Sequence, residues 1–308
     1  MKAPVLNPLL TGIASRFMQG LPLAGSRIAP VLNTALQSAN YYVYDASNLT
    51  DIPTDIRRAP SAPFARVKSK LSDDNFFAKD YGVEEPVDNS EIALYGGIFP
   101  AEKSTMERAV RIVAVNHEIR VRNICRAVAQ TASPSVKWNA GSNTTIIADV
   151  KAAKNAIHAS TGTDPNLLVL PRDVFNALEV APELLEKFKY TEGGNVTLAQ
   201  MRTLFGVDEI LVAGDLINSA AEGQTASLGG IWSDEAFLCY SNPSQDIKAL
   251  TFMRTFNWTA MAGSGPKGIS TFTYPEDQID SRVVRARQYT DEKIIASGAA
   301  YYLSNVLS

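Results

Sequence analysis

The sequence contains few of the residues that build metal centres and disulfide frameworks. Its 308 residues include two histidines and two cysteines. Cys125 and Cys239 are too few for a disulfide framework, so a reducing compartment is expected. His117 and His158 lie far apart, each within a helical pattern, and no CxxC or HxxxH spacing supplies the three or four ligands of a zinc ion. We therefore expect no metal and no cofactor, with both histidines packed within or exposed on helices.

A strong excess of charge and a long apolar run are also missing. The 29 basic and 32 acidic residues give a formal net charge of −3, which provides no electrostatic basis for tight duplex binding. No apolar run approaches the roughly 20 residues of a membrane helix. The start has one basic residue and a proline at position 4, which argues against a secretory signal. The 45% of hydrophobic residues suffices for a real core, and the length indicates about two structural units.

Catalytic motifs are missing as well. Residues 263–268 match GxGxxG, but Pro266 interrupts the loop, and residues 269–274 are typical of a strand instead of the helix that would hold a phosphate. The sequence has neither a GxxxxGK[ST] loop nor a GxSxG elbow. The carboxylate pairs Asp73-Asp74 and Glu84-Glu85 lie in turn-like or extended segments, where neighbours point to opposite faces. We expect a turn at 263–268 and no enzyme.

The first fifty residues are unlike the start of a compact domain. Four prolines interrupt them, and only 27–39 fits a short helix. The segment is too apolar for disorder and long for a buried connection. An extended arm lying on a neighbouring copy would bury its apolar side chains, and a frayed terminus is the alternative.

Residues 57–91 suggest a long two-stranded hairpin. Residues 64–71 alternate between apolar and basic, 72–75 carry a turn signal, and 76–83 can return as a second strand. The outgoing limb is mostly basic and the returning limb mostly acidic. A lone ribbon is marginally stable, so it needs a surface to lie on. These charges either pair within the hairpin or set the register against a neighbouring subunit, and both alternatives remain open. Our candidate inter-subunit contacts are Arg66, Lys68, Lys70, Glu84 and Glu85.

A long amphipathic helix is predicted for residues 104–130. Ser104 and Glu107 form a capping-box pattern, and an apolar stripe follows at helical spacing. Mixed helices and strands come next, with helices expected at 144–161, 173–190 and 196–205, the second of them kinked near Pro182. Short buried strands are expected at 167–170, 209–212 and 236–240, and the chain is strand-rich after residue 250. This order predicts an α+β or mixed α/β protein.

The order of these parts resembles the major capsid proteins of tailed bacteriophages, a fold that also builds encapsulin shells. The likeness is strongest in residues 166–243, which include the segments 167–171 and 204–212. The ending at 299–305 also looks like the terminal strand of that family. The resemblance covers most of the chain as a profile of apolar positions, with no catalytic signature.

The resemblance implies an α+β capsid fold with five parts. They are an N-terminal arm (1–51), an extended hairpin loop (52–91), a peripheral domain (92–142) with a spine helix (104–130), an axial domain (143–268), and closing strands (269–308) mainly in the peripheral domain.

The implied function is that of a structural protein. Copies of the chain would assemble as pentamers and hexamers into an icosahedral shell around double-stranded DNA, which the protein contacts without sequence-specific binding and without a membrane or cofactor. Scaffold, portal and decoration proteins, where used, would be separate chains. The expected location is the virion capsid, and the host cytoplasm during assembly. The alternatives are an encapsulin-like shell holding protein cargo and, less favoured, a mixed α/β small-molecule enzyme.

Overall fold

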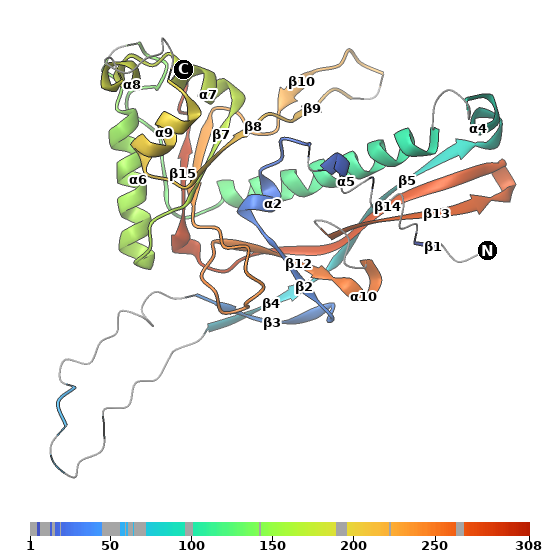
Figure 1. Ribbon diagram of the computed structural model, residues 1–308, viewed down its shortest axis with the longest axis horizontal. Coiled ribbons are helices and arrows are strands. Elements are labelled where there is room, and N and C mark those ends of the chain that lie inside the picture. The colour runs from blue at the N-terminus through green and yellow to red at the C-terminus, as the bar shows by residue number, and fades with distance from the viewer. Residues whose placement is uncertain are drawn as a thin grey trace.

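Figure 1 shows an elongated molecule, with helices packed around a sheet at one end and a long helix beside long strands at the other. This computed structural model describes residues 5–6, 13, 16–18, 20–44, 56–58, 60, 64, 72–95, 101–141, 143–188, 196–221, 223–262 and 268–308. Every helix within these residues is too short or too polar to cross a bilayer.

The predicted long helix is α5 (Ala101–Arg126). Its buried residues recur every three or four positions, including Met106, Val110, Val113 and Val121, as expected of a helix with one face on a core. The helix begins three residues earlier than predicted, so Ser104 lies inside it and the predicted capping box is wrong. It also ends four residues earlier, because the chain after it turns into β6 (Thr131–Ala132), which pairs with the last strand.

One sheet lies along α5 (Figure 1). We name it the peripheral sheet, and the five-stranded sheet described next the axial sheet, after the predicted parts of the chain. Within the described residues the strand order of the peripheral sheet is β1-β13-β14-β12-β2. Strand β5 pairs with β14 along the edge opposite to β13. Residues Val284 and Ala286 of the central strand pack on the buried face of α5. The strand bounds are β1 (Val5–Leu6), β2 (Val31–Thr34), β5 (Lys79–Asp88), β12 (Met253–Trp258), β13 (Ile269–Glu276) and β14 (Ser281–Ile294).

The axial sheet has the order β6-β15-β11-β7-β8 in the described chain. Its strands β7 (Leu167–Pro171), β8 (Glu209–Ala213) and β11 (Glu235–Cys239) confirm the three predicted short strands. Strands β7 and β11 are buried throughout, which explains the unbroken apolar runs at 167–171 and 236–239. The last strand, β15 (Ala300–Ser304), pairs with β11. The closing residues are therefore divided, with β13 and β14 in the peripheral sheet and β15 in the axial one.

Four helices pack on the axial sheet, namely α6 (Ile146–Thr161), α7 (Arg172–Glu179), α8 (Pro182–Lys187) and α9 (Leu198–Phe205). Helices α6 and α9 each end at a glycine in the left-handed conformation, with φ of 71° at Gly162 and 62° at Gly206. The single kinked helix predicted for 173–190 is two helices, because Pro182 starts a new one and has no backbone N–H to continue the first.

The N-terminal segment 20–44 folds onto its own chain. It contains α2 (Gly25–Ile28), β2, and β3 (Ser38–Val43). Ala24, Ile28 and Ala29 fill a core between α5 and the axial sheet. The expectation that this segment buries its apolar side chains on another copy is therefore wrong for residues 20–44. The helix predicted for 27–39 is also wrong, because residues 31–34 pair with β12 in parallel.

The predicted self-contained hairpin is replaced by two other pairings. Strand β4 (Ser72–Phe77) pairs with β3, and β5 pairs with β14 along its whole length. The turn predicted for 72–75 is therefore a strand, because tertiary pairing overrides local turn preference. Most of residues 45–71, including the expected outgoing limb, lie outside the described residues. The remaining described elements are α4 (Asn89–Tyr95), α10 (Thr259–Ala262), η2 (Asp277–Ile279), η3 (Ser297–Ala299), β9 (Leu216–Asn218) and β10 (Leu228–Gly230).

Candidate assembly surfaces

The β3–β4 ribbon pairs residues 38–43 with residues 72–77 and has one packed face and one exposed face. On its inner face, the rings of Phe76 and Phe256 stack at 4.2 Å, with Tyr41 at 5.3 Å from Phe256. The Tyr41 hydroxyl donates to Asp74 Oδ2 at 3.1 Å. Burial and this bond raise the pKa of Tyr41, so its hydroxyl stays protonated. On the outer face, Tyr42 and Phe77 are 40% and 53% exposed.

Ion pairs join β5 to its neighbours on both faces. Glu84 pairs with Arg285 across the sheet, and Glu85 Oε1 lies 3.1 Å from Arg108 Nη1 on α5. Both carboxylates that we predicted at subunit contacts thus have partners in their own chain, and neither partner belongs to the predicted hairpin. The other three predicted contacts, Arg66, Lys68 and Lys70, lie outside the described residues. Their inter-subunit role stays a prediction.

A buried carboxylate joins α5 to the axial sheet. Glu235, at 1% exposure, accepts hydrogen bonds from Arg126 at 2.7 and 3.0 Å and from Arg122 at 3.5 Å. The Tyr302 hydroxyl also donates to it at 2.7 Å. Burial, followed by this bond to Glu235, raises the pKa of Tyr302 to about 12. One carboxylate therefore connects α5, β11 and β15.

A second carboxylate joins α5 to the peripheral sheet. Arg120 Nε and Nη2 donate to the two oxygens of Glu292 at 3.0 and 2.9 Å. Burial alone would raise the pKa of Glu292, but the bonds from Arg120 and the charge of His117 outweigh it and lower the pKa. His117 Nε2 lies 3.0 Å from Thr255 Oγ1, which donates to the carbonyl of Ala29. The arginines at these two junctions are thus matched by acids of the same chain.

Sequence reasoning missed both junctions. Glu235 and Glu292 look like ordinary surface acids in the sequence. The available signal was the i, i+4 spacing of Arg122 and Arg126, which places two guanidinium groups on one face of a helix. Their shared acceptor, Glu235, is 109 residues away from Arg126 along the chain.

The β9–β10 hairpin is an exposed surface that the sequence did not predict. Its register pairs Leu228 with Asn218 and Gly230 with Leu216, which places both leucines on one face. Leu216 is 51% exposed and Leu228 is 66% exposed. Ile217 points to the other face and packs against the core between α5 and the axial sheet.

The histidines, the cysteines and part of the predicted turn can be placed in the structure. No group of three His, Cys, Asp or Glu side chains within the described residues is placed to hold a metal ion. His117 is buried on α5 and His158 is exposed on α6, where it pairs with Asp164 at 2.9 Å. Both cysteines are free and buried, and burial raises the pKa of each thiol. Of the predicted turn at 263–268, only Gly268 is described, with φ of 74°.

The structure resembles shell-forming proteins over nearly its whole length. A phage-related protein from Bordetella bronchiseptica RB50 aligns with a TM-score of 0.77 and 20% identity over 99% of both chains. A virus-like particle from Pyrococcus furiosus aligns with a TM-score of 0.56 and 11% identity over 96% of both. The capsid of cyanophage P-SCSP1u aligns with a TM-score of 0.56 and 9% identity, over 93% of this chain and 89% of the other. The predicted class, the tailed-phage capsid fold, is confirmed.

The sequence comparison points to one particular kind of chain with this fold. The major capsid protein of Burkholderia phage BcepMu is 22% identical over 219 residues, which are 68% of this chain and 69% of that protein. No protein-family model matches the sequence. The resemblance to phage major capsid proteins that was drawn from the order of elements is thus confirmed by an independent relative.

Proposed function

We propose that this chain is a major capsid protein, a structural subunit that assembles as pentamers and hexamers into an icosahedral shell around double-stranded DNA. The observation that carries the proposal is the fold, which is shared over more than nine-tenths of the chain with a phage capsid and a virus-like particle. The aligned major capsid protein of phage BcepMu supports it. We assign the chain no catalytic role and place it in the virion capsid after assembly in the host cytoplasm.

The charge distribution supports a shell that encloses DNA without gripping it. Strong phosphate binding requires several unpaired cationic side chains in one place. On α5, the arginines at 108, 111, 120, 122 and 126 each pair with a carboxylate of the same chain. The five arginines of the long helix are therefore already paired with four carboxylates, and we expect no sequence-specific DNA contact along it.

Contacts between copies would combine many weak interactions. We retain the pairing of Arg66, Lys68 and Lys70 of one copy with Glu84 and Glu85 of the next. Exposed ion pairs contribute only about 0–1 kcal/mol each, so a cation from a neighbour can share a carboxylate with Arg285 or Arg108 at little cost. Repetition over a closed shell multiplies such small terms.

The β9–β10 hairpin supplies a second candidate contact surface. An isolated two-stranded ribbon is marginally stable in water, and unprotected strand edges tend to pair with other chains. Strand β5 carries a charge or proline at six of its ten positions, and the Gln245 side chain bonds the outer edge of β2 at Val31 and Asn33. Neither β9 nor β10 has a charged residue. The hairpin therefore lacks the charges that protect the edge of a strand, and we expect it to contact a neighbouring copy.

Electron microscopy and sedimentation of the purified protein test the proposed function directly. We expect closed hollow particles under at least one assembly condition. Subunits that remain small and monodisperse under all conditions would refute the assignment.

A protein-filled compartment, the encapsulin-like alternative that the sequence resemblance implies, is the second candidate. Purified particles separate the two functions by content. A high ratio of absorbance at 260 to 280 nm, removed by nuclease only after the particles are opened, indicates packaged DNA. A co-purifying protein in fixed ratio indicates protein cargo.

A further inference from the structure

Glu118 is a buried carboxylate on α5 that binds groups from two other parts of the chain. Its Oε1 accepts the backbone N–H of Ala24 at 3.1 Å and the indole Nε1–H of Trp232 at 2.6 Å. Its Oε2 accepts the backbone N–H of Gly25 at 2.6 Å. The residue is 1% exposed. One side chain thus joins the N-terminal segment, the long helix and the loop before β11.

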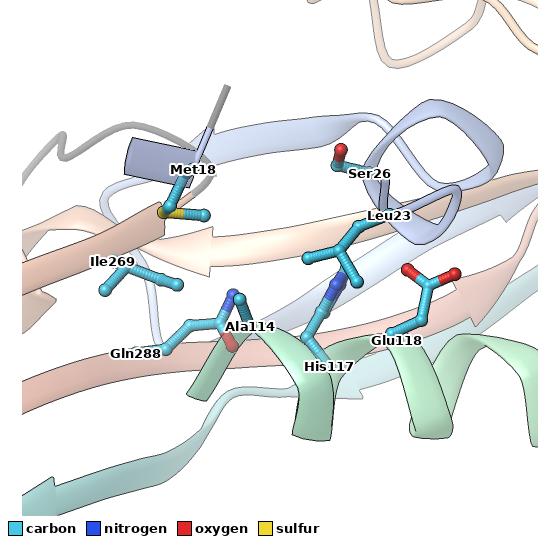
Figure 2. A pocket seen from close by; sticks show the side chains of 8 residues that line it. All are labelled: Met18, Leu23, Ser26, Ala114, His117, Glu118, Ile269 and Gln288. Carbon is cyan, nitrogen blue, oxygen red and sulfur yellow. The ribbon is translucent and has the colours of Figure 1, made fainter. Parts of the chain in front are cut away.

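The fit around this carboxylate is close. A Cβ atom on Gly25 would lie 2.6 Å from Glu118 Oε2, so even alanine at this position would push the carboxylate away. Figure 2 shows Glu118 rising from α5 toward the segment that carries Leu23 and Ser26. The adjacent cavity has a volume of about 10 Å³, which holds about one water molecule. The structure leaves little room for the carboxylate to bind elsewhere.

The attachment lies directly before the part of the segment that enters the sheet. Six residues after Gly25, Val31 begins the pairing of β2 with β12. The chain then forms β3, which pairs with β4 and frames residues 45–71. The segment is therefore held at several places, among them Glu118, the Arg27–Glu209 ion pair, β12, and the aromatic cluster around Phe256. Among these anchors, Glu118 is a buried carboxylate that accepts two backbone N–H groups of the segment.

We propose that Glu118 is a positioning residue for shell assembly. It fixes residues 20–34 on their own subunit and thereby orients the β3–β4 ribbon before copies meet. The inference rests on the proposed function, because it concerns how a subunit is prepared for assembly. It assigns a role to an acid that is buried within its own subunit.

Three variants and one control test this role by hydrogen exchange and by assembly. Glu118→Gln replaces one acceptor oxygen with an NH₂ group that faces a backbone donor, Gly25→Ala displaces the carboxylate, and Trp232→Phe removes one donor. Ser26→Ala is the control, on the same segment and cavity wall. We expect exchange in residues 20–34 to rise at least about tenfold in Glu118→Gln and Gly25→Ala, the size expected for one lost charge-assisted bond. Exchange in α6 should stay as in the wild type.

Assembly is measured on the same samples. We expect the two stronger variants to yield at least about tenfold fewer particles, Trp232→Phe to show a smaller loss in both measurements, and Ser26→Ala to match the wild type. These expectations scale with the number of bonds lost. If the Glu118→Gln variant does not fold, Gly25→Ala and Trp232→Phe decide whether the attachment at Glu118 matters for assembly.

Two results would overturn the inference. One is unchanged exchange in residues 20–34 in Gly25→Ala, and the other is normal assembly despite raised exchange there. Failure of the wild type to form particles would instead count against the proposed function, while the exchange measurement would still test the attachment.

Discussion

The N-terminal segment 20–44 and the β9–β10 hairpin show opposite relations between composition and burial. The segment is apolar and contains two prolines, and the sequence suggests an arm that lies on another copy. Its first part is instead packed between α5 and the axial sheet, and β2 and β3 pack around Phe256 of the same chain. The hairpin (residues 216–230) is built mostly of small residues such as alanine, glycine and serine, yet it exposes two leucines. The comparison teaches that an apolar segment is buried by whichever surface the fold brings to it, including its own.

Truncating one apolar side chain in each region should give the largest difference in the free energy of unfolding. Ile28→Ala removes a fully buried side chain and should lower the free energy of unfolding of the isolated subunit by about 2–5 kcal/mol. Leu228→Ala in the hairpin should change it by less than about 0.5 kcal/mol, as is usual for surface substitutions. Denaturant unfolding of both variants measures the difference. Equal losses would mean that the hairpin is buried in the free subunit.

Adding charge to the hairpin should reverse this order when assembly is measured. Leu216→Lys with Leu228→Lys should leave the unfolding free energy within about 1 kcal/mol of the wild type, and should lower particle yield because like charges would meet at a subunit contact. Lysine at Ile247, an equally exposed apolar position on another loop, is the control for added charge. Normal yield from the hairpin variant would exclude the hairpin from the contacts.

Acid should loosen the N-terminal segment before it affects the hairpin. The pKa of Glu292 is lowered from its ordinary 4.5 in the folded chain, so this group adds stability above that value and loses it as the pH falls through the lowered pKa. Its partner His117 lies beside Thr255, which bonds Ala29 of the segment. Unfolding free energy should therefore fall below about pH 4.5, and Glu292→Gln should flatten this decline. An identical pH profile in the variant would contradict the assignment.

The smallest effect is expected at the ion pairs of β5. Glu84→Gln and Glu85→Gln should each change the unfolding free energy of the isolated subunit by about 0–1 kcal/mol, because both pairs are partly exposed. A loss of several kcal/mol would show that these pairs stabilise the subunit itself. A selective decline of assembly at raised salt would support their sharing with Arg66, Lys68 and Lys70 of a neighbour.

Local patterns predicted the elements whose partners are near in sequence or whose burial is uniform. The stripe of α5 and the unbroken apolar runs of β7 and β11 were enough to locate them. The pairings of β2 with β12 and β3 with β4 join residues far apart, so no local pattern reports them. The turn signal at 72–75 misled because Asp73 and Asp74 bond Asn40 and Tyr41 of β3.

The buried carboxylates were out of reach for the same reason. Glu118 falls near the edge of the apolar stripe of α5, and its donors belong to residues more than 90 positions away. A sequence pattern indicates that a helix has one apolar face, but it does not show which backbone N–H groups will meet an acid on that helix. The candidate contacts Glu84 and Glu85 come directly after the predicted strand at 76–83 and lie on β5 in the structure. Their partners Arg285 and Arg108 were not foreseen.

Cryo-electron microscopy of an assembled wild-type particle tests the central claim most directly. We predict a closed shell in which residues 20–44 lie on their own subunit, joined to α5 through Glu118, while the β9–β10 hairpin contacts a neighbouring copy. A shell in which residues 20–44 cross to a neighbour and the hairpin faces only solvent would contradict this account.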